Sequence, residues 1–322
     1  MDAHTWNEIG KTGILGNHQL SKKLYKVVLG ECVVFPFTND QGIGFKRNAG
    51  ETVNLMHVNE LPDPDSAETE EDGQIPTDKL TFGNRAITLK AYGRGVKFTE
   101  LAENLSVFKP SDVLKEKLQD QMTRVMDTMA ANAFQEAAAV KVVFSPTSLT
   151  GGVWATSGTP GALAVAPLTL DHCKLISAYM RDTIHVPFYT KNYYIGFTCN
   201  KNIESLTDDR GLIQWHQYLG KGDLLFNNEM GMVHKIRWIE VNRAAAFSNV
   251  AGTSSVFGEG VVFGKEGVAY LEAVAPHLRM NPNFQGNFGT VQAMAWWGVI
   301  AFGSIWNLPD DGKAKIIRLD SL

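Results

Sequence analysis

An acidic segment separates two strand-like stretches in the first third of the chain. Between Asn48 and Asp78 there are nine Asp and Glu residues and no Lys or Arg. The stretches on either side, GETVNL (50–55) and RAITLKAY (85–92), alternate as half-buried strands do. The polypeptide between them carries three prolines and little that can enter a core. The sequence therefore predicts a long two-stranded tongue with an acidic tip, which is only marginally stable in water unless it lies on another surface.

The acidic tip is predicted to meet basic residues of a neighbouring subunit. Outside this segment the chain carries 30 basic and 25 acidic residues, so the remainder of the molecule offers cations. The predicted acidic contact residues are Glu60, Asp63, Asp65, Glu68, Glu70, Glu71 and Asp72. Calcium is an alternative ligand for these carboxylates, but their order does not match an EF-hand loop. A solvated or interface-facing charge run is the favoured interpretation.

The first thirty residues are polar and show no sustained hydrophobic period. Lys22, Lys23 and Lys26 form a basic group near their end. A segment of this kind has too little apolar surface to fold by itself, and it is typical of a terminal arm. We expect this arm, with its three lysines, to be ordered by contacts with neighbouring subunits.

One long helix is predicted after the tongue, over residues 109–140. Its apolar residues recur at steps of three and four, which is the period of one helix face. They are Leu114, Leu118, Met122, Val125, Met129 and Ala133. Ser111 is the expected N-cap, with Asp112 in the first turn. About 28 residues would span roughly 42 Å, so the helix suits a rod that braces a flat molecule.

The rest of the chain reads as a mixed α+β region. A second helix is expected over 168–183 with Thr169 as its cap, after a Gly/Ser/Thr-rich connector at 145–161. Strands are expected at 193–200 and 235–242, and further strands separated by Gly264 and Gly267 are expected within 259–274. A short helical stretch is expected at 212–219. The last apolar stretch, 293–306, is apolar on both alternating faces, which predicts a strand buried on both sides.

The sequence carries no signature of catalysis or of a cofactor. No HExxH pair, nucleophile elbow or phosphate-binding loop is present. The GRG string at Gly93–Gly95 sits on an expected strand, not at the start of a helix as a dinucleotide-binding loop would. The three cysteines are far apart and are expected to be reduced. These observations predict a protein with no catalytic residues, no metal and no cofactor, and the longest apolar stretch is too short to span a membrane.

Several strings in this order resemble the major capsid proteins of tailed bacteriophages. They are GIGFKRNAGETVNLMHV (42–58), DKLTFGNRAITLKAYGRGVKFTELAENLS (78–106), LQDQMTRVMDTMAANAF (118–134), GMVHKIRWIEVNRAAAF (231–247) and GEGVVFGKEGVAYLE (258–272). The nearest resemblance is to the podovirus-type, N-four-type branch. No single string is diagnostic, and the order of the blocks carries the resemblance from about Lys22 onward.

The resemblance implies the Hong Kong 97 fold and a set of domains. These would be an N-terminal arm (1–44), an extended loop with the acidic tip (45–99), a peripheral domain with the spine helix (100–185 and 285–322) and an axial domain (186–284). By the same resemblance, the tongue lies across an adjacent subunit. The chain begins directly with its arm, so any scaffolding is expected to be a separate protein.

The function that the resemblance implies is assembly. Copies of the chain would form the hexamers and pentamers of an icosahedral virion shell in the bacterial host cytoplasm, around double-stranded DNA. Portal, scaffolding and decoration proteins are further expected partners, and a net charge of −4 fits only weak, non-specific contact with DNA. Three alternatives remain: a shell of a bacterial encapsulin-type nanocompartment with an enzyme cargo, a phage decoration or tail protein, and a hydrolase with a hidden site.

Overall fold

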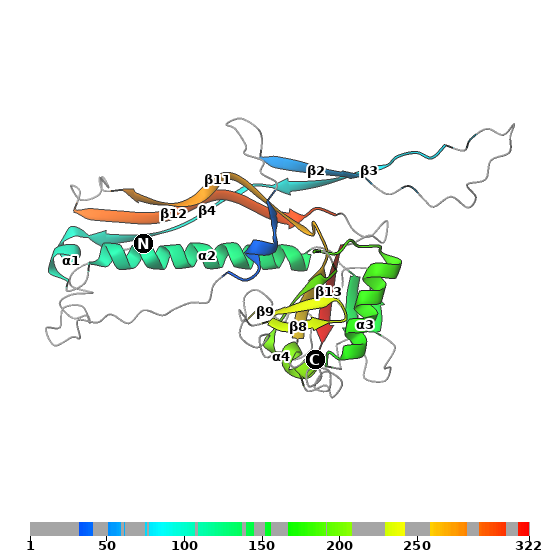
Figure 1. Ribbon diagram of the computed structural model, residues 1–322. Helices are drawn as coiled ribbons and strands as arrows, with labels where there is room; N and C mark the ends of the chain where they lie inside the picture. Colours follow the sequence, from blue (N-terminus) through cyan, green and yellow to red (C-terminus); the bar gives the residue numbers. More distant parts are fainter. Residues whose placement is uncertain are drawn as a thin grey trace. The chain divides into compact units, whose positions relative to one another are not determined.

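The computed structural model of the chain describes residues 32–40, 51–58, 61, 75, 77–106, 109–136, 140–144, 152–155, 167–190, 192–207, 229–241, 258–281, 290–306 and 315–321 (Figure 1). The chain divides into two compact units. The first comprises Met1–Glu51, Leu89–Ala131 and Tyr270–Phe302, and the second comprises Thr52–Thr88, Asn132–Ala269 and Gly303–Leu322. Each unit therefore combines segments that are far apart in the sequence.

A four-stranded sheet with the order β1-β11-β12-β4 forms the body of the first unit. Its strands are β1 (Asn39–Asp40), β4 (Lys90–Thr99), β11 (Val268–Asn281) and β12 (Val291–Ser304). β12 and β4 are antiparallel, with Val291 opposite Thr99 and Ile300 opposite Lys90. A short helix, α1 (Glu100–Leu105), follows β4, and the Thr99 hydroxyl accepts a hydrogen bond from the Ala102 backbone at its start.

The predicted long helix is confirmed as α2 (Pro110–Glu136), 27 residues long. α2 lies along one face of the sheet (Figure 1), and its apolar stripe packs against that face. The residues that recur at steps of three and four are therefore the ones that contact the sheet. The buried members of this cluster are Phe98, Leu118, Met294 and Trp296, and the half-buried ones include Leu114, Met122 and Val125. The Trp296 indole also donates a hydrogen bond to the side-chain oxygen of Gln121, at 3.3 Å.

The start of α2 differs from the prediction. The helix begins at Pro110, so Ser111 lies in the first turn and is not the N-cap. Proline suits the first helical position because its missing N–H would have no partner there. The Ser111 hydroxyl instead donates to a carboxylate oxygen of Glu103, at 2.6 Å. The prediction of Ser111 as N-cap was therefore wrong, because its hydroxyl bonds to Glu103 in α1 and does not cap α2.

The two faces of β12 are also unequal, contrary to the predicted burial on both sides. Met294 and Trp296 are buried in the cluster with the side chains of α2, and Ile300 farther along the strand is also buried. Trp297 and Val299, on the opposite face, are only half-buried. The sequence correctly indicated that both faces are apolar, but on the second face only Ala301 is buried to core level.

The end of the predicted arm is tied to the first unit. A short 3₁₀ helix, η3 (Phe35–Phe37), precedes β1. The buried carboxylate of Asp127 in α2 accepts hydrogen bonds from the backbone N–H groups of Val34, at 2.8 Å, and Phe35, at 3.0 Å. The Phe35 ring stands edge-on to Tyr270, with ring centres 5.2 Å apart. Residues 32–40 are therefore packed as part of the first unit.

A seven-stranded sheet with the order β6-β5-β13-β10-β7-β9-β8 forms the body of the second unit. Its strands are β5 (Val140–Phe144), β6 (Gly152–Ala155), β7 (Tyr194–Thr198), β8 (Glu229–Val233), β9 (Ile236–Glu240), β10 (Gly258–Phe263) and β13 (Ile316–Ser321). The pairs β5–β13 and β7–β9 are parallel, and the others are antiparallel. β6 lies within the region that we predicted to be a connector, which corrects that prediction. The predicted helix at 212–219 lies outside the described residues.

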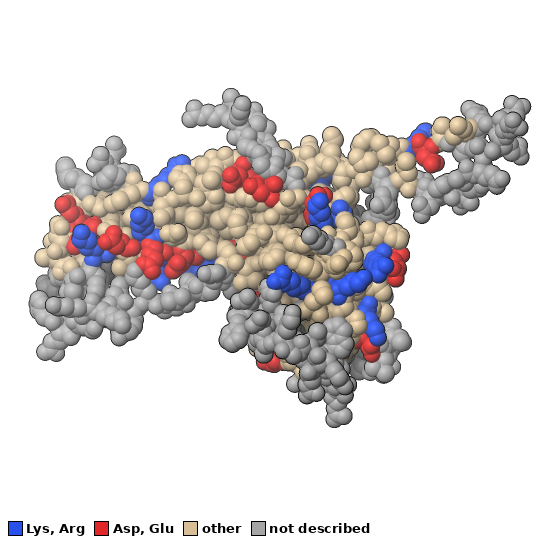
Figure 2. Space-filling view, viewed as in Figure 1, with Lys and Arg blue, Asp and Glu red and all other residues tan. Residues whose placement is uncertain are grey.

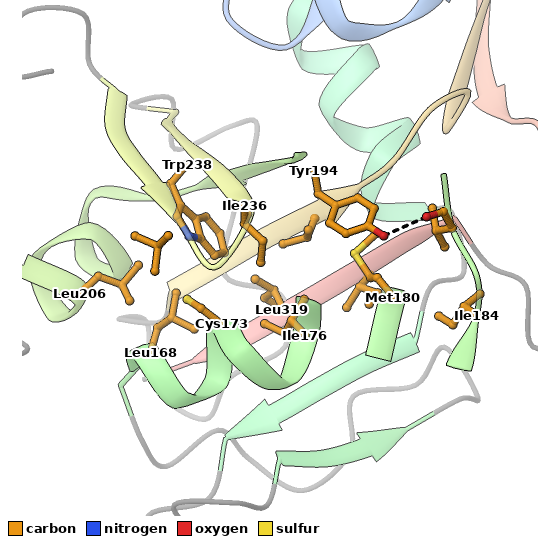
Figure 3. Packing of buried hydrophobic residues seen from close by; sticks show 14 residues of the cluster. Leu168, Cys173, Ile176, Met180, Ile184, Tyr194, Leu206, Ile236, Trp238 and Leu319 are labelled. Atoms are coloured by element: carbon orange, nitrogen blue, oxygen red, sulfur yellow. Dashed lines mark hydrogen bonds between the residues drawn. The ribbon is translucent and has the colours of Figure 1, made fainter. Parts of the chain in front are cut away.

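Three helical segments belong to the second unit: α3 (Leu170–Ala178), the π-helical turn η4 (Tyr179–Thr183) and α4 (Asn200–Thr207). The predicted cap is confirmed, because Thr169 and His172 form a capping box at the start of α3. The buried side chains of Cys173, Ile176 and Met180 pack against Trp238 and other apolar residues of the sheet (Figure 3). This cluster is the main core of the unit.

Candidate functional site

The predicted tongue is present as a two-stranded ribbon, β2 (Thr52–Val58) paired antiparallel with β3 (Phe82–Thr88) (Figure 1). Thr52 lies opposite Thr88, and Val58 lies opposite Phe82. The second predicted strand is interrupted at Leu89: β3 ends at Thr88 and β4 begins at Lys90. Because side chains alternate along a strand, this register gives the ribbon two faces of different character.

One face of the ribbon is buried. Val53, Leu55 and Ile87 are each less than one-tenth exposed. A Cβ atom added at Gly303 would lie 2.6 Å from the Ile87 side chain, so the ribbon approaches the backbone there as closely as only glycine permits. These contacts fix the ribbon on the second unit.

A stack of three side chains supports the same face nearer the tip. The imidazole of His57 lies against the Trp306 indole, with ring centres 5.1 Å apart. The Lys315 ammonium stands 3.7 Å from the centre of the indole ring, within cation–π range. The Trp306 N–H donates to the carbonyl oxygen of Glu266, at 3.0 Å, which fixes the orientation of the ring. A side chain at Gly83 would collide with His57, its cross-strand partner.

The other face of the ribbon is exposed, and it is apolar at the end where Val58 lies opposite Phe82. Farther along the same face Thr52, Asn54, Asn84 and Thr88 are polar. Met56 is 74% exposed and Phe82 is 66% exposed, and Val58 lies beside them. Six of the ten large hydrophobic residues that are exposed in the described part of the chain lie between Met56 and Phe82. They are Met56, Val58, Leu61, Ile75, Leu80 and Phe82. Concentrated apolar exposure of this kind marks an interaction surface.

The predicted contact residues themselves lie outside the described residues. These are the acidic residues Glu60, Asp63, Asp65, Glu68, Glu70, Glu71 and Asp72 and the basic residues Lys22, Lys23 and Lys26. The apolar end of the ribbon was not predicted, because the first strand was expected to end at Leu55 and β2 continues to Val58. Continuing the alternation to Val58 would have placed Met56 and Val58 on the outward face.

Basic side chains gather on the second unit, over the part where α3, β8 and β9 lie (Figure 2). His234 and Lys235 form the β8–β9 turn, both with positive φ, at 46° and 65°. The Lys235 ammonium lies 5.6 Å from the centre of the Phe188 ring. Arg237 donates to the Tyr193 hydroxyl, at 3.3 Å.

Burial lowers the pKa of His234, and the nearby charge of Lys174 lowers it further. We call Lys174, His234, Lys235 and Arg237 the basic turn cluster.

The part of the chain that the structure describes contains no group of three His, Cys, Asp or Glu residues that could hold a metal ion. Within the same residues, no helix is long and apolar enough to cross a membrane. Cys32, Cys173 and Cys199 are not in disulfide bonds. The GRG string lies within β4, and a Cβ atom at Gly93 would come within 2.7 Å of the Trp296 carbonyl oxygen. These glycines therefore permit close strand packing.

Comparison with solved structures finds the same fold in phage capsids. A chain of the cyanophage Pam1 capsid asymmetric unit matches with a TM-score of 0.74 at 14% identity, covering 95% of this chain and 96% of that one. The capsid of Ralstonia phage GP4 matches with a TM-score of 0.66 at 13% identity, covering 97% of each chain. The head structure of Helicobacter pylori bacteriophage KHP40 matches with a TM-score of 0.64 at 11% identity, covering 95% of each.

No family model matches the sequence, and no curated protein matches it either. The structural matches cover nearly the whole of both chains, so they are not confined to one shared motif. The chain therefore has the α+β fold of these capsid chains, as its resemblance to the Hong Kong 97 fold implied.

Proposed function

We propose that this chain is the major capsid protein of a tailed bacteriophage. The observation that carries the proposal is the end-to-end match with the Pam1 capsid chain, at a TM-score of 0.74 over 95% of this chain. The same fold alone would permit other roles. The exposed apolar face of the β2–β3 ribbon adds an independent reason to expect assembly, since it has the character of an interface.

In this proposal the ribbon is an assembly element. One face of the ribbon already packs on its own chain through Ile87. Burial of the outward side chains of Met56 and Phe82 stabilises the protein only when another surface covers them. Head-to-tail contacts between identical chains generate closed rings when the rotation closes, and hexamers and pentamers are rings of this type. Obligate interfaces bury on the order of 2,000–5,000 Å², which requires elements that reach beyond the subunit body.

The four domains inferred from the resemblance remain part of the proposal: arm (1–44), extended loop (45–99), peripheral domain (100–185 and 285–322) and axial domain (186–284). The anchoring of η3 by Asp127 refines the first of them. Because residues 32–40 pack on their own subunit, the part of the arm proposed to reach neighbours is the part before Cys32.

The proposed location is the virion, with assembly in the cytoplasm of the bacterial host. The proposed partners are other copies of the chain, together with portal, separate scaffolding and decoration proteins. Packaged double-stranded DNA is a weak and non-specific partner, because the chain has a net charge of −4. We propose no catalytic role, no metal and no cofactor for the chain.

An encapsulin-type nanocompartment shell is the second candidate function, and it would enclose an enzyme cargo in place of DNA. The three matched structures described above are phage capsids or heads, which favours the phage shell. The contents of particles purified from the source decide between the two. Double-stranded DNA supports the phage shell, and a protein cargo supports the nanocompartment.

Sedimentation of the purified chain tests the proposal and the role of the ribbon together. We expect the parent protein to form large, fast-sedimenting particles. The variant Met56→Ser with Phe82→Ser should sediment as small species while keeping its circular dichroism spectrum. Met232→Ser removes another exposed methionine, 54% exposed, outside the ribbon and serves as the matched control. A parent that never forms particles contradicts the shell function, and a ribbon variant that assembles like the control contradicts the role of the ribbon.

A further inference from the structure

The basic turn cluster of the second unit is built on an uncommon backbone conformation. His234 and Lys235 are the two central residues of the β8–β9 turn, where Asn-Gly usually supplies the positive φ that such a turn needs. His185 also has positive φ, at 54°, and it follows the π-helical turn η4 by two residues. These are three of the four non-glycine residues with positive φ in the described part of the chain. Residues held in such conformations concentrate at functional sites, so this surface is a candidate for one.

The buried side chain of Tyr194 connects these segments (Figure 3). Its backbone N–H donates to the carbonyl oxygen of Lys235, at 2.8 Å. Its hydroxyl donates to the carbonyl oxygen of Val186, the residue after His185, also at 2.8 Å. Burial raises the pKa of Tyr194, and the nearby charge of Arg181 acts in the opposite direction. The β8–β9 turn and the segment with Arg181 and His185 therefore lie close together.

Four cations from three elements lie in this part of the second unit. Lys174 in α3, Arg181 in η4 and Lys235 in the β8–β9 turn are exposed, and Arg237 in β9 is half-buried. His234 is not counted among them, because burial and the charge of Lys174 lower its pKa.

Two of these cations are supported by aromatic rings. The Lys235 ammonium lies 5.6 Å from the centre of the Phe188 ring, which in turn lies against Tyr194 with ring centres 4.7 Å apart. The Arg237 guanidinium lies 5.7 Å from the centre of the Tyr193 ring and donates to the hydroxyl of the same residue. Cation–π contacts of this kind restrict long side chains. Less conformational freedom is then lost when a partner binds.

Two carboxylates oppose the four cations. Asp171 lies 3.9 Å from the Lys174 ammonium, but both side chains are at least half exposed, so the pair is weak. Asp182 follows Arg181 in η4, and its charge also acts on the Tyr194 hydroxyl. Four cations against two carboxylates leave a local surplus of positive charge, in a chain whose net charge is −4.

A duplex nucleic acid is the kind of anion that suits this arrangement. Double-stranded DNA carries one negative charge per about 1.7 Å of helix axis, so it can meet several separate cations without one fixed geometry. A small anion instead needs a few polar groups aimed at one point in a pocket. The cations here stand on separate elements, which favours an extended partner with repeated charges.

We propose that the basic turn cluster, together with Arg181, is the surface on which this chain contacts the phosphate backbone of packaged double-stranded DNA. The inference rests on the proposed function, since a DNA-filled shell brings duplex to this surface at high concentration. It requires that the surface face the interior of the shell. The contact is made to phosphates and not to base edges, so it carries no sequence preference. It is weak for one chain and is repeated over every copy in the wall.

Fluorescence anisotropy with a short labelled duplex and the unassembled full-length chain measures this contact at low salt. Four phosphate contacts contribute about −3.6 to the log–log salt slope. Lys174→Gln with Lys235→Gln removes two of them. This cluster variant should reduce the slope by about 1.8 and weaken binding at about 20 mM salt by at least about tenfold.

A matched control removes the same charge elsewhere. Lys90→Gln with Arg94→Gln neutralises two exposed cations of β4 in the first unit and should bind as the parent does. Lys174→Arg with Lys235→Arg keeps the charge of the cluster and should retain binding. The proposal is overturned by a cluster variant that binds like the parent, or by a control that loses as much affinity and slope as the cluster variant.

Competition distinguishes nucleic acid from an acidic protein segment. Unlabelled duplex and poly-glutamate are added to the complex at equal concentrations of charge. The duplex should displace the label at the lower concentration, because an extended peptide spaces its charges about 3.3–3.6 Å apart and the duplex spaces them about 1.7 Å apart. Displacement by poly-glutamate at an equal or lower concentration would identify an acidic protein as the partner and overturn the proposal.

Lysine acetylation places the contact in the particle. Mass spectrometry should show Lys174 and Lys235 less acetylated in DNA-filled particles than in particles that have released their DNA, whereas Lys90 should be equally acetylated in both. Equal acetylation of Lys174 and Lys235 in the two preparations overturns the contact with packaged DNA. Particles that contain no DNA overturn the proposed function itself. Failure of the duplex assay for a chain that forms DNA-filled particles overturns this inference alone.

Discussion

At the scale of single residues, Asp127 joins the segment before η3 to α2. Its carboxylate is fully buried and accepts two backbone N–H groups, from Val34 and Phe35. Asp127→Ala leaves both donors without this acceptor, and a buried unsatisfied donor costs about 1–3 kcal/mol. We expect Asp127→Ala to lower the free energy of unfolding of the unassembled subunit by at least about 2 kcal/mol in urea.

Two comparisons make this expectation specific. Asp127→Asn keeps one oxygen acceptor and should lose less stability than Asp127→Ala. Thr128→Ala removes an exposed hydroxyl that bonds within the same helix and should be nearly neutral. Equal stabilities of Asp127→Ala and Thr128→Ala would show that the carboxylate does not hold the arm.

His172 gives the second unit a pH dependence. Burial lowers the pKa of His172, and the negative charge of Asp171 offsets this only in part. Its Nδ1 accepts the Thr169 backbone N–H in the capping box, and a protonated ring cannot accept. Because the folded-state pKa lies below the unfolded value, the unfolded chain binds more protons, and stability falls as the pH drops below about 6.5.

Thermal melts of the unassembled subunit between pH 7.5 and pH 5 check this sign. The melting temperature of the parent should fall with pH, and the fall should be smaller in His172→Gln. His234 has a lowered pKa as well, so the double variant with His234→Gln should be flatter still. A steeper fall in His172→Gln than in the parent would contradict the assignment.

At the scale of elements, the ribbon presents two faces that should respond differently to substitution. Ile87→Ala removes buried apolar volume and should lower the free energy of unfolding of the unassembled subunit by about 2–5 kcal/mol. Phe82→Ser, on the exposed face, should change that free energy little and act on assembly instead. Urea unfolding of both variants is the measurement. A loss in Phe82→Ser as large as that in Ile87→Ala would mean that the face is already covered within one chain.

Helices and strands that depend on local sequence patterns were predicted correctly, whereas contacts between distant segments were not. The stripe of Leu114, Leu118 and Met122 is a local pattern, and it placed α2 correctly. The prediction of Ser111 as N-cap was wrong, and its hydroxyl donates to Glu103, eight residues away in α1. The parallel pairing of β5 with β13 joins residues such as Val140 and Ile317, and no local signal specifies so distant a partner.

The candidate site was predictable only where a local pattern in the sequence specifies it. Alternation and the acidic segment indicated a ribbon, and β2 and β3 pair as expected. The stack of His57, Trp306 and Lys315 could not be foreseen, because its residues come from three separate stretches of the sequence. The half-buried Trp297 was predicted to be a core residue because a partly exposed strand face can be as apolar in sequence as a buried one.

At the scale of the whole molecule, the charge of the chain limits its affinity for DNA. The net charge is −4, and Lys22, Lys23 and Lys26 are the densest basic group of the arm. Three phosphate contacts give a log–log salt slope of only about −2.7. We expect fluorescence anisotropy of the unassembled subunit to show no appreciable duplex binding at about 150 mM salt, roughly physiological ionic strength. Submicromolar affinity for one duplex sequence over others would instead indicate a sequence-reading function.

The central claim is that copies of this chain build a closed shell, and electron microscopy of purified particles tests it most directly. We expect closed icosahedral particles whose wall consists of the 35.4 kDa chain in hundreds of copies. Quantitative gel densitometry of the same preparation gives the copy number. Particles that contain only a few copies of this chain, in a wall built from another protein, would contradict the claim.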